Sequence, residues 1–196
     1  MHQTDNYRKY KTTNPLQRFL INRFLDTVLR EARIISPKSL LEAGCGEGFI
    51  LERLYKANIG QKRVGIDYSD SALALAKQER PHLDIRKGDI LNIPYRDDTF
   101  DLVVCCEVLE HLGSPERALS ELHRVTKQYV LLSVPNEPWF MFANFFRGKN
   151  LTRMGNDIDH KNHWSGDGIE RFVSDKFTIF TRKQPFPWTI LVGEKK

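Results

Sequence analysis

Residues 40–48, Leu-Leu-Glu-Ala-Gly-Cys-Gly-Glu-Gly, combine an apolar run, a carboxylate and three glycines at alternate positions. The next residues, 49–55, carry apolar side chains at helical spacing, so this stretch predicts a strand, a tight turn and the start of a helix. Glycines permit positive φ angles and a close approach of a ligand to the main chain. Free N–H groups at the start of a helix bind hydrogen-bond acceptors. The stretch is therefore a candidate ligand-binding loop.

Two carboxylates indicate which ligand this loop would bind. The spacing is G-x-G-x-G rather than the G-x-G-x-x-G of dinucleotide sites, and Glu42 lies two residues before Gly44, where it would repel a pyrophosphate and attract a cation. Asp67 ends the next predicted strand, 21 positions after Gly46, about where an acid that binds ribose hydroxyls is expected. A ligand with a ribose at one end and a positive, phosphate-free group at the other satisfies both carboxylates. S-adenosylmethionine (SAM) fits that description.

Four motifs, in order, resemble those of class I SAM-dependent methyltransferases, in particular the type 11 and ubiquinone-pathway O-methyltransferase groups. The match runs from about Ser39 to Asn136, and the motifs are residues 42–48, Gly65-Ile66-Asp67-Tyr68-Ser69, Gly88-Asp89-Ile90 and Phe100-Asp101-Leu102-Val103-Val104. Four motifs in the right order are more specific than any one of them. The alternative is a Rossmann-like domain for another nucleotide, and an NAD-dependent enzyme is the weakest of the rivals.

The resemblance implies a cofactor site for SAM and for its product, S-adenosylhomocysteine. Glu42 would act on the methionyl ammonium, Asp67 would bind the ribose hydroxyls and Tyr68 would stack near the adenine. For Asp89, a plain loop-capping role is the alternative to a contact with the adenine amine. The remaining candidates would shape the methionine pocket or hold the adenosine, and they are Gly44, Cys45, Gly46, Gly48, Ser69, Ile90 and Cys106.

The elements that must position these residues alternate along the chain. Strands are predicted at 39–43, 63–67, 83–87, 101–106 and 129–134, with a hairpin at 177–181 and 188–192; helices are predicted at 15–33, 49–58, 70–80, 115–126 and 166–172. With the resemblance, this order predicts a single-domain α/β fold, a Rossmann-like doubly wound sheet of seven mostly parallel strands with one antiparallel strand. Residues 1–38 would form an N-terminal helical cap. Residues 39–196 would form the SAM-binding domain, with a substrate-side insert at about 137–168.

The residues after the fourth predicted strand, Glu107-Val108-Leu109-Glu110-His111, should lie beside the transferred methyl group. In one interpretation His111 is a general base that takes a proton from an acceptor hydroxyl. In a second, Glu107, Glu110 and His111 bind a divalent cation together with a later histidine such as His160, since residues i and i+3 of a helical turn share a face. In a third, these residues only pack or are solvated. The second pattern is similar to that of ubiquinone-pathway O-methyltransferases and of methyltransferases that act on the 3′ ends of small RNAs.

Two later stretches are candidates for binding the substrate. His160 and His163, in the loop 157–165, could supply a base or complete a metal site; the alternatives are ordinary loop hydrogen bonds and a cap for the following helix. Residues 138–149 are apolar on nearly every helical face, which indicates either a buried cap or a lid over a bulky aromatic, isoprenoid or lipid-linked substrate.

Composition limits the remaining choices. The chain has 196 residues, a net charge of +5 and three cysteines without zinc-like spacing, which predicts one domain with reduced thiols in the cytoplasm. No stretch predicts a secretory signal or a membrane span, although transient membrane contact is compatible with the apolar stretch. The predicted activity is methyl transfer to a small or lipid-linked acceptor on oxygen. The alternatives are ribose 2′-O-methylation of RNA and a non-catalytic SAM-binding module. The sequence does not predict the oligomeric state.

Overall fold

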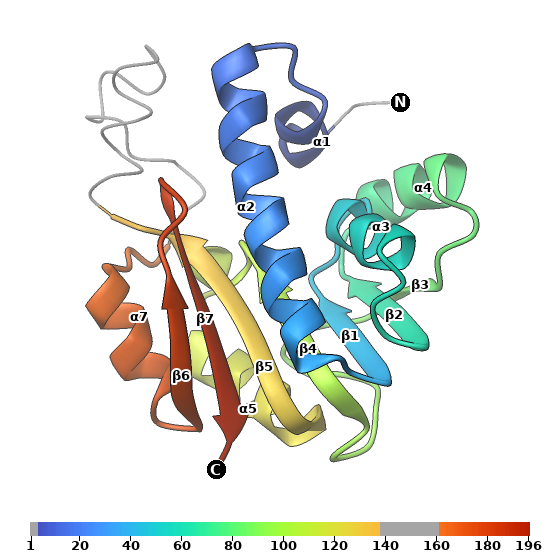
Figure 1. Cartoon of the computed structure of the whole chain (residues 1–196). Helices are drawn as coiled ribbons and strands as arrows, with labels where there is room; N and C mark the ends of the chain where they lie inside the picture. Colours follow the sequence, from blue (N-terminus) through green and yellow to red (C-terminus); the bar gives the residue numbers. More distant parts are fainter. Residues whose placement is uncertain (1–3, 138–160) are drawn as a thin grey trace.

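The computed structural model describes residues 4–137 and 161–196. His160, most of the predicted insert and the apolar stretch 138–149 lie outside these residues. The described part forms a seven-stranded sheet of order β3-β2-β1-β4-β5-β7-β6 (Figure 1). The strands are β1 (Ser39–Ala43), β2 (Lys62–Asp67), β3 (Ile85–Lys87), β4 (Phe100–Cys106), β5 (Thr126–Pro135), β6 (Phe177–Lys183) and β7 (Trp188–Lys195).

The sheet confirms the predicted doubly wound topology. Strand β1 pairs in parallel with β2 on one side and with β4 on the other, with Leu41 opposite both Val64 and Val103. Strand β7 lies antiparallel between β5 and β6, as the predicted hairpin requires. The strand order reverses between β1 and β4, and in such sheets a ligand binds at the carboxyl ends of the strands next to this switch point.

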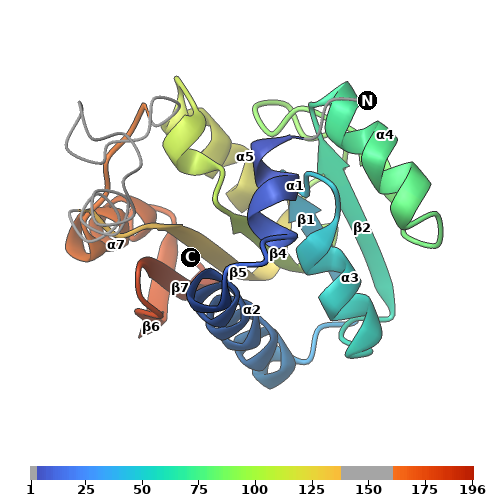
Figure 2. The same ribbon diagram turned by 90° about the horizontal axis from the view of Figure 1, so that it is seen from above.

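Helices cover both faces of the sheet (Figure 2). Helices α2 (Pro15–Ile35) and α3 (Phe49–Lys56) pack on one face, and α5 (Pro115–Val125) and α7 (Gly166–Val173) pack on the other. Side chains of a strand alternate between the faces of the sheet. Leu40 therefore belongs to the apolar core under α2 and α3, and Leu41 belongs to the apolar core under α5 and α7. Helix α4 (Asp70–Glu79) links β2 to β3, and a short helix, α1 (Asp5–Tyr10), precedes α2. Among the described residues, no helix combines the length and apolarity needed to cross a bilayer.

Local signals explain where the helices begin. Asn14, Ser69 and Ser165 are the N-caps of α2, α4 and α7, and each side chain accepts a backbone N–H from the first turn of its helix. The predicted starts of these helices are therefore confirmed. Helix α1 was not predicted, because residues 5–10 are polar and show no apolar periodicity.

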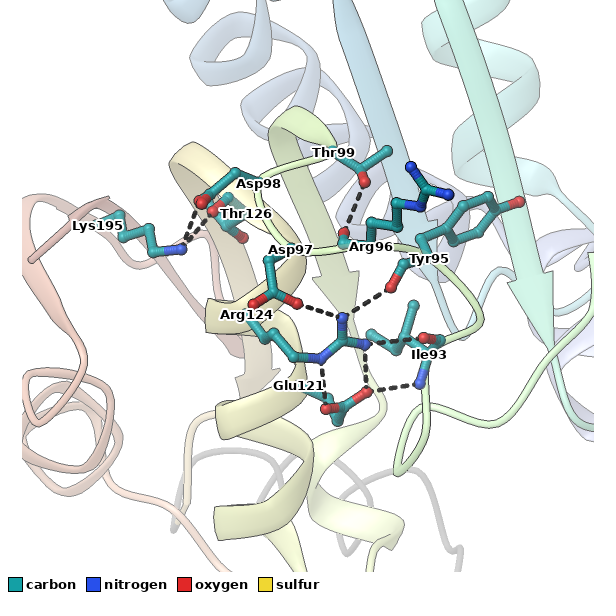
Figure 3. A network of polar contacts seen from close by, with 10 residues as sticks. All are labelled: Ile93, Tyr95, Arg96, Asp97, Asp98, Thr99, Glu121, Arg124, Thr126 and Lys195. Atoms are coloured by element: carbon teal, nitrogen blue, oxygen red, sulfur yellow. Dashed lines mark hydrogen bonds and ion pairs between the residues drawn. The ribbon is translucent and has the colours of Figure 1, made fainter.

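Arg124 ties the loop between β3 and β4 to helix α5 (Figure 3). Its guanidinium donates to the carbonyl oxygens of Ile93 and Tyr95, at 2.9 and 2.7 Å, and to both carboxylate oxygens of Glu121, at 2.8 Å. It also pairs with Asp97 at 2.9 Å. These contacts fix a loop that has little regular structure of its own and that runs from the adenine-side motif to the central strand β4.

Candidate active site

A cavity of about 820 Å³ lies at the carboxyl ends of the central strands. Its walls come from the glycine turn after β1, the end of β2, the loop after β3, the turn after β4, and helices α1 and α2. Among the described residues, thirteen of those predicted from the sequence line it, namely Glu42, Gly44, Cys45, Gly46, Asp67, Tyr68, Ser69, Asp89, Ile90, Cys106, Glu107, Glu110 and His111. Gly48 and His163 do not line it.

The glycine turn adopts backbone angles that disfavour other residues. Gly44 has a φ of +78° and Gly46 a φ of +53°. A Cβ atom on Gly44 would lie 2.4 Å from Cγ2 of Val108 in the turn after β4. Gly48, with a φ of +82°, is the N-cap of α3, and a Cβ there would lie 2.6 Å from Ile85 in β3. Gly48 therefore sets the start of the helix and its packing, rather than the cavity surface.

The carboxylate of Asp67 joins the two loops that meet at this edge. It accepts the N–H of Gly46 at 2.7 Å and the N–H of Ser69 at 2.8 Å. Asp89 accepts the N–H of Leu91 at 2.8 Å, so the loop-capping alternative describes what its side chain does in this structure. Tyr68 is 75% exposed and lines the cavity.

Glu42 carries a carboxylate that is almost fully buried at the cavity. Its Oε2 atom has no hydrogen-bond partner within residues 4–137 and 161–196. Burial raises its pKa well above the ordinary value, and the nearby charge of Asp67 adds to that increase. A buried acceptor without a partner is costly, and the ammonium group of a bound amino acid would satisfy it. The donors and acceptors of this part of the cavity therefore fit the methionyl and ribosyl parts of SAM.

Helix α1 contacts the glycine turn. Thr4 Oγ1 and Asn6 Nδ2 donate to the buried carboxylate of Glu47, and Tyr10 stacks on Phe49 with ring centroids 4.5 Å apart. Figure 2 shows α1 above the carboxyl ends of β1 and β4. This helix adds Asn6, Lys9 and Tyr10 to the cavity wall. A helical cap over residues 1–38 was predicted, but these three residues were not named as candidates.

Glu107 is held by donors from three separate elements. Its carboxylate accepts from Trp188 Nε1 in β7 at 2.5 Å and from Ser133 Oγ in β5 at 3.2 Å, and it pairs with Lys9 of α1 at 3.3 Å. Its φ is +60°, so the helical turn expected over 107–111 is limited to the 3₁₀ turn Leu109–His111. The expectation that Glu107 and Glu110 share one face of a helical turn was therefore wrong.

The Glu110 side chain is buried beneath the turn, and neither of its carboxylate oxygens has a hydrogen-bond partner among the described residues. Burial, with a further contribution from the charge of Glu107, raises its pKa well above the ordinary value. Its backbone oxygen accepts N–H groups from Lys161 at 2.8 Å and Asn162 at 3.0 Å. Asn162 Nδ2 also donates to the carbonyl oxygens of Leu109 and Leu112. Residues 161 and 162 are thereby tied to the turn that carries His111.

The three candidate histidines have different positions. His111 is exposed and lines the cavity. His163 lies away from the cavity lining, with Nδ1 3.9 Å from Oε1 of Glu137. His160 is outside the described residues. Within the described ranges, no group of three or more histidine, cysteine, aspartate or glutamate side chains could hold a metal ion. The cation site that includes His160 therefore stays a prediction.

The sheet topology and the cavity define a Rossmann-like domain for an adenosine cofactor with a cationic amino-acid end. Comparison with known proteins agrees with that class. Residues 41–133 match the family described as a methyltransferase domain. A methyltransferase of Encephalitozoon cuniculi is 32% identical over 166 residues, which cover 82% of this chain and 71% of that protein. The chain belongs to the class I SAM-dependent methyltransferases.

Other relatives share shorter segments. A SAM-dependent methyltransferase of Mycolicibacterium smegmatis is 34% identical over 113 residues, 57% of this chain and 43% of that protein. The mitochondrial ubiquinone biosynthesis O-methyltransferase of Schizosaccharomyces pombe is 32% identical over 110 residues, 53% of this chain and 39% of that protein. The chain thus spans about two fifths of the length of these two relatives.

The crystal structure of magnesium protoporphyrin IX methyltransferase from Synechocystis PCC 6803, with bound S-adenosylhomocysteine, has the same fold. It superposes with a TM-score of 0.75 at 18% identity, covering 96% of this chain and 92% of that chain.

Proposed function

We propose that this protein transfers the methyl group of SAM to an oxygen atom of a small or lipid-linked acceptor. The observation that carries the proposal is that the His111 turn shares one cavity with the cofactor-binding ends of β1 and β2. The volume of about 820 Å³ is in the upper part of the usual range for ligand pockets, roughly 300–1,000 Å³, and supports binding of an acceptor beside the cofactor.

SAM, when bound, supplies a methyl group on a positively charged sulfur. Glu42 would hold the ammonium end and Asp67 the ribose, which fixes the direction in which the methyl group faces. His111 would accept the proton of the acceptor hydroxyl at an imidazole nitrogen, as a general base positioned beside the acceptor. Val108, Leu112 and Trp188 supply apolar wall to the same cavity and would exclude water from the reacting atoms. Catalysis would then depend mainly on positioning and desolvation.

Different observations support the chemical class of the acceptor and the identity of the atom that is methylated. The name of the fission yeast relative specifies ubiquinone biosynthesis and an oxygen acceptor, which supports a small, lipid-linked phenol. Other relatives are named as a norajmaline N-methyltransferase and as demethylmenaquinone methyltransferases. The names therefore favour small acceptors, whereas the choice of oxygen rests on His111.

The test uses methyl-labelled SAM with three probes: a catechol with a short isoprenyl tail, the same molecule with both oxygens already methylated, and a small RNA. We expect the catechol to gain one base-stable methyl ether, detected by mass spectrometry, and the other two to stay unlabelled. Label in the RNA would support the ribose alternative. Tight binding of S-adenosylhomocysteine without any transfer would support the non-catalytic alternative. Either of these two results would overturn the proposal.

A pair of variants tests the role of His111. His111→Ala should lower kcat by roughly 10²–10⁴-fold, the usual contribution of a general base, with unchanged affinity for S-adenosylhomocysteine. His82→Ala is the matched control, because His82 pairs with Glu52 on the surface, away from the cavity. Unchanged turnover of His111→Ala would exclude the base role. Loss of activity with a chelator, restored by added Mg²⁺, would favour the cation interpretation instead.

The cellular location is part of the same proposal. All three cysteines are free and buried, and burial raises the pKa of each thiol. Buried neutral thiols support the predicted reducing, cytoplasmic location.

A further inference from the structure

Helix α2 presents a second face to solvent, away from the sheet. Leu16, Phe19, Arg23, Asp26 and Arg30 follow one another at intervals of three or four residues and are all exposed. Residues at this spacing share one side of a helix. Leu16 and Phe19, at the start of α2, are 63% and 61% exposed. The exposed face therefore has an apolar end and a cationic middle.

A groove of about 500 Å³ runs between this face and the segment 183–185 at the end of β6. It is lined by Phe19, Arg23, Arg30 and Lys183, together with the carboxylate of Asp26. Within the described part of the chain, no hydrogen bond or ion pair holds the side chains of Arg23, Arg30 and Lys183. Three cations against one carboxylate make the groove a site for anionic groups.

Helix α2 and the segment 183–188 contribute residues to both the groove and the candidate active site. Gln17, Leu20 and Ile21 on the other side of α2 line the active-site cavity, as do Pro187 and Trp188. Phe186, which is 41% exposed, precedes them in the turn between β6 and β7. Figure 1 shows this turn reaching the same end of the molecule as α1 and the start of α2. Phe186, together with Leu16 and Phe19 at the start of α2, therefore adds exposed apolar side chains at this end of the molecule.

We infer that this face of α2, with the groove and the turn 184–187, docks the protein onto a membrane containing anionic phospholipids. Leu16, Phe19 and Phe186 would enter the boundary between headgroups and acyl chains, while Arg23, Arg30 and Lys183 would bind headgroup phosphates. Basic side chains beside exposed apolar ones are the combination that binds such interfaces. This inference rests on the proposed function, because a lipid-linked acceptor would reach the cavity from the same surface.

The charge pattern favours a membrane over a second copy of the chain. A symmetric contact between two such faces would bring Arg23, Arg30 and Lys183 near their own copies, with only Asp26 to offset the repulsion. Phosphate groups in a bilayer instead supply many negative charges on one plane, and the apolar end of the face has hydrocarbon to enter.

The test measures co-sedimentation of the full chain with vesicles of phosphatidylcholine, with and without added phosphatidylserine. Each basic residue near an anionic surface contributes about 1 kcal/mol, so Arg23→Gln/Arg30→Gln should weaken binding to the mixed vesicles by about 30-fold. The matched control is Lys77→Gln/Arg96→Gln, which removes two exposed charges elsewhere and should bind like the wild type. Leu16→Ala/Phe19→Ala should also weaken binding, and its remaining binding should still fall with added salt.

Folding and the proposed reaction are checked separately. Each variant should retain affinity for S-adenosylhomocysteine and turnover of a water-soluble catechol, so a failed membrane test would not be confused with a failed reaction. The inference is overturned if the wild type does not bind the mixed vesicles, or if both charge variants bind equally. It is also overturned if inorganic phosphate alone saturates the groove and leaves vesicle binding unchanged, or if sedimentation shows a dimer that Leu16→Ala/Phe19→Ala dissociates.

Discussion

Replacing Gly44 with alanine would test how the glycine turn is fitted to the turn after β4. A non-glycine residue at the observed φ of +78° costs about 1–2 kcal/mol. The added Cβ would also meet Val108, with Cγ2 at 2.4 Å and Cγ1 at 3.2 Å. Val108 is branched at Cβ and has few alternative rotamers, so the contact adds an overpacking cost of about 1–3 kcal/mol. The unfolding free energy should therefore fall by about 2–5 kcal/mol.

The same change should damage the cofactor site. The turn can relieve the contact only by moving away from Val108, and this movement would displace the N–H of Gly46 from Asp67. We expect affinity for S-adenosylhomocysteine, measured by calorimetry, to fall at least about tenfold, which is 1.4 kcal/mol. Urea denaturation supplies the change in stability.

Gly60→Ala is the matched control, because Gly60 has the same φ of +78° and lies outside the cavity lining. It should lose stability and keep its affinity for S-adenosylhomocysteine. A double-mutant cycle between Gly44→Ala and Val108→Ala should show a favourable coupling of about 1–3 kcal/mol. Wild-type affinity in Gly44→Ala, or an equal loss of affinity in Gly60→Ala, would refute the reasoning.

Three further predictions follow from buried or shared charges. In urea titrations, Glu42→Gln should be more stable than the wild type at pH 8, and the difference in unfolding free energy should close toward pH 4. The reason is that burial raises the folded-state pKa of Glu42. The wild type therefore loses stability as the pH rises above the unfolded-state pKa of about 4.3. A difference independent of pH would contradict this. Arg124→Met should lower the unfolding free energy by about 2 kcal/mol, because the carbonyls of Ile93 and Tyr95 and the carboxylate of Glu121 lose their shared donor. The control, Arg96→Met at an exposed position, should change the unfolding free energy by less than about 0.5 kcal/mol. Equal effects of the two variants would refute the role of the network. Lys9→Met should speed the hydrogen exchange of residues 4–11, because the ion pair between Lys9 and Glu107 is lost. The control, Lys11→Met, should not accelerate exchange near Glu107. Unchanged exchange in Lys9→Met would show that this ion pair does not hold α1.

The sequence by itself determined the sheet, the glycine turn and the cofactor end of the cavity. Each of these depends on short-range patterns: apolar runs set the strands, glycines set the turn, and Ser69 and Ser165 set helix starts. Parallel strands place their carboxyl ends at one edge, so Glu42 and Asp67 could be predicted to lie together without knowing any long-range contact.

Only the tertiary structure decided the arrangement at the end of the cavity where we propose that the acceptor binds. Glu107 meets Trp188, 81 residues later, and Lys9, 98 residues earlier. No local period or spacing encodes such a meeting, because it depends on where β7 and α1 lie in the finished fold. The burial of Glu110 and the attachment of residues 161 and 162 to its turn have the same origin. A pattern of residue types can nominate a carboxylate for chemistry, but the packed neighbours decide which donors already occupy its oxygens and how far it lies from water.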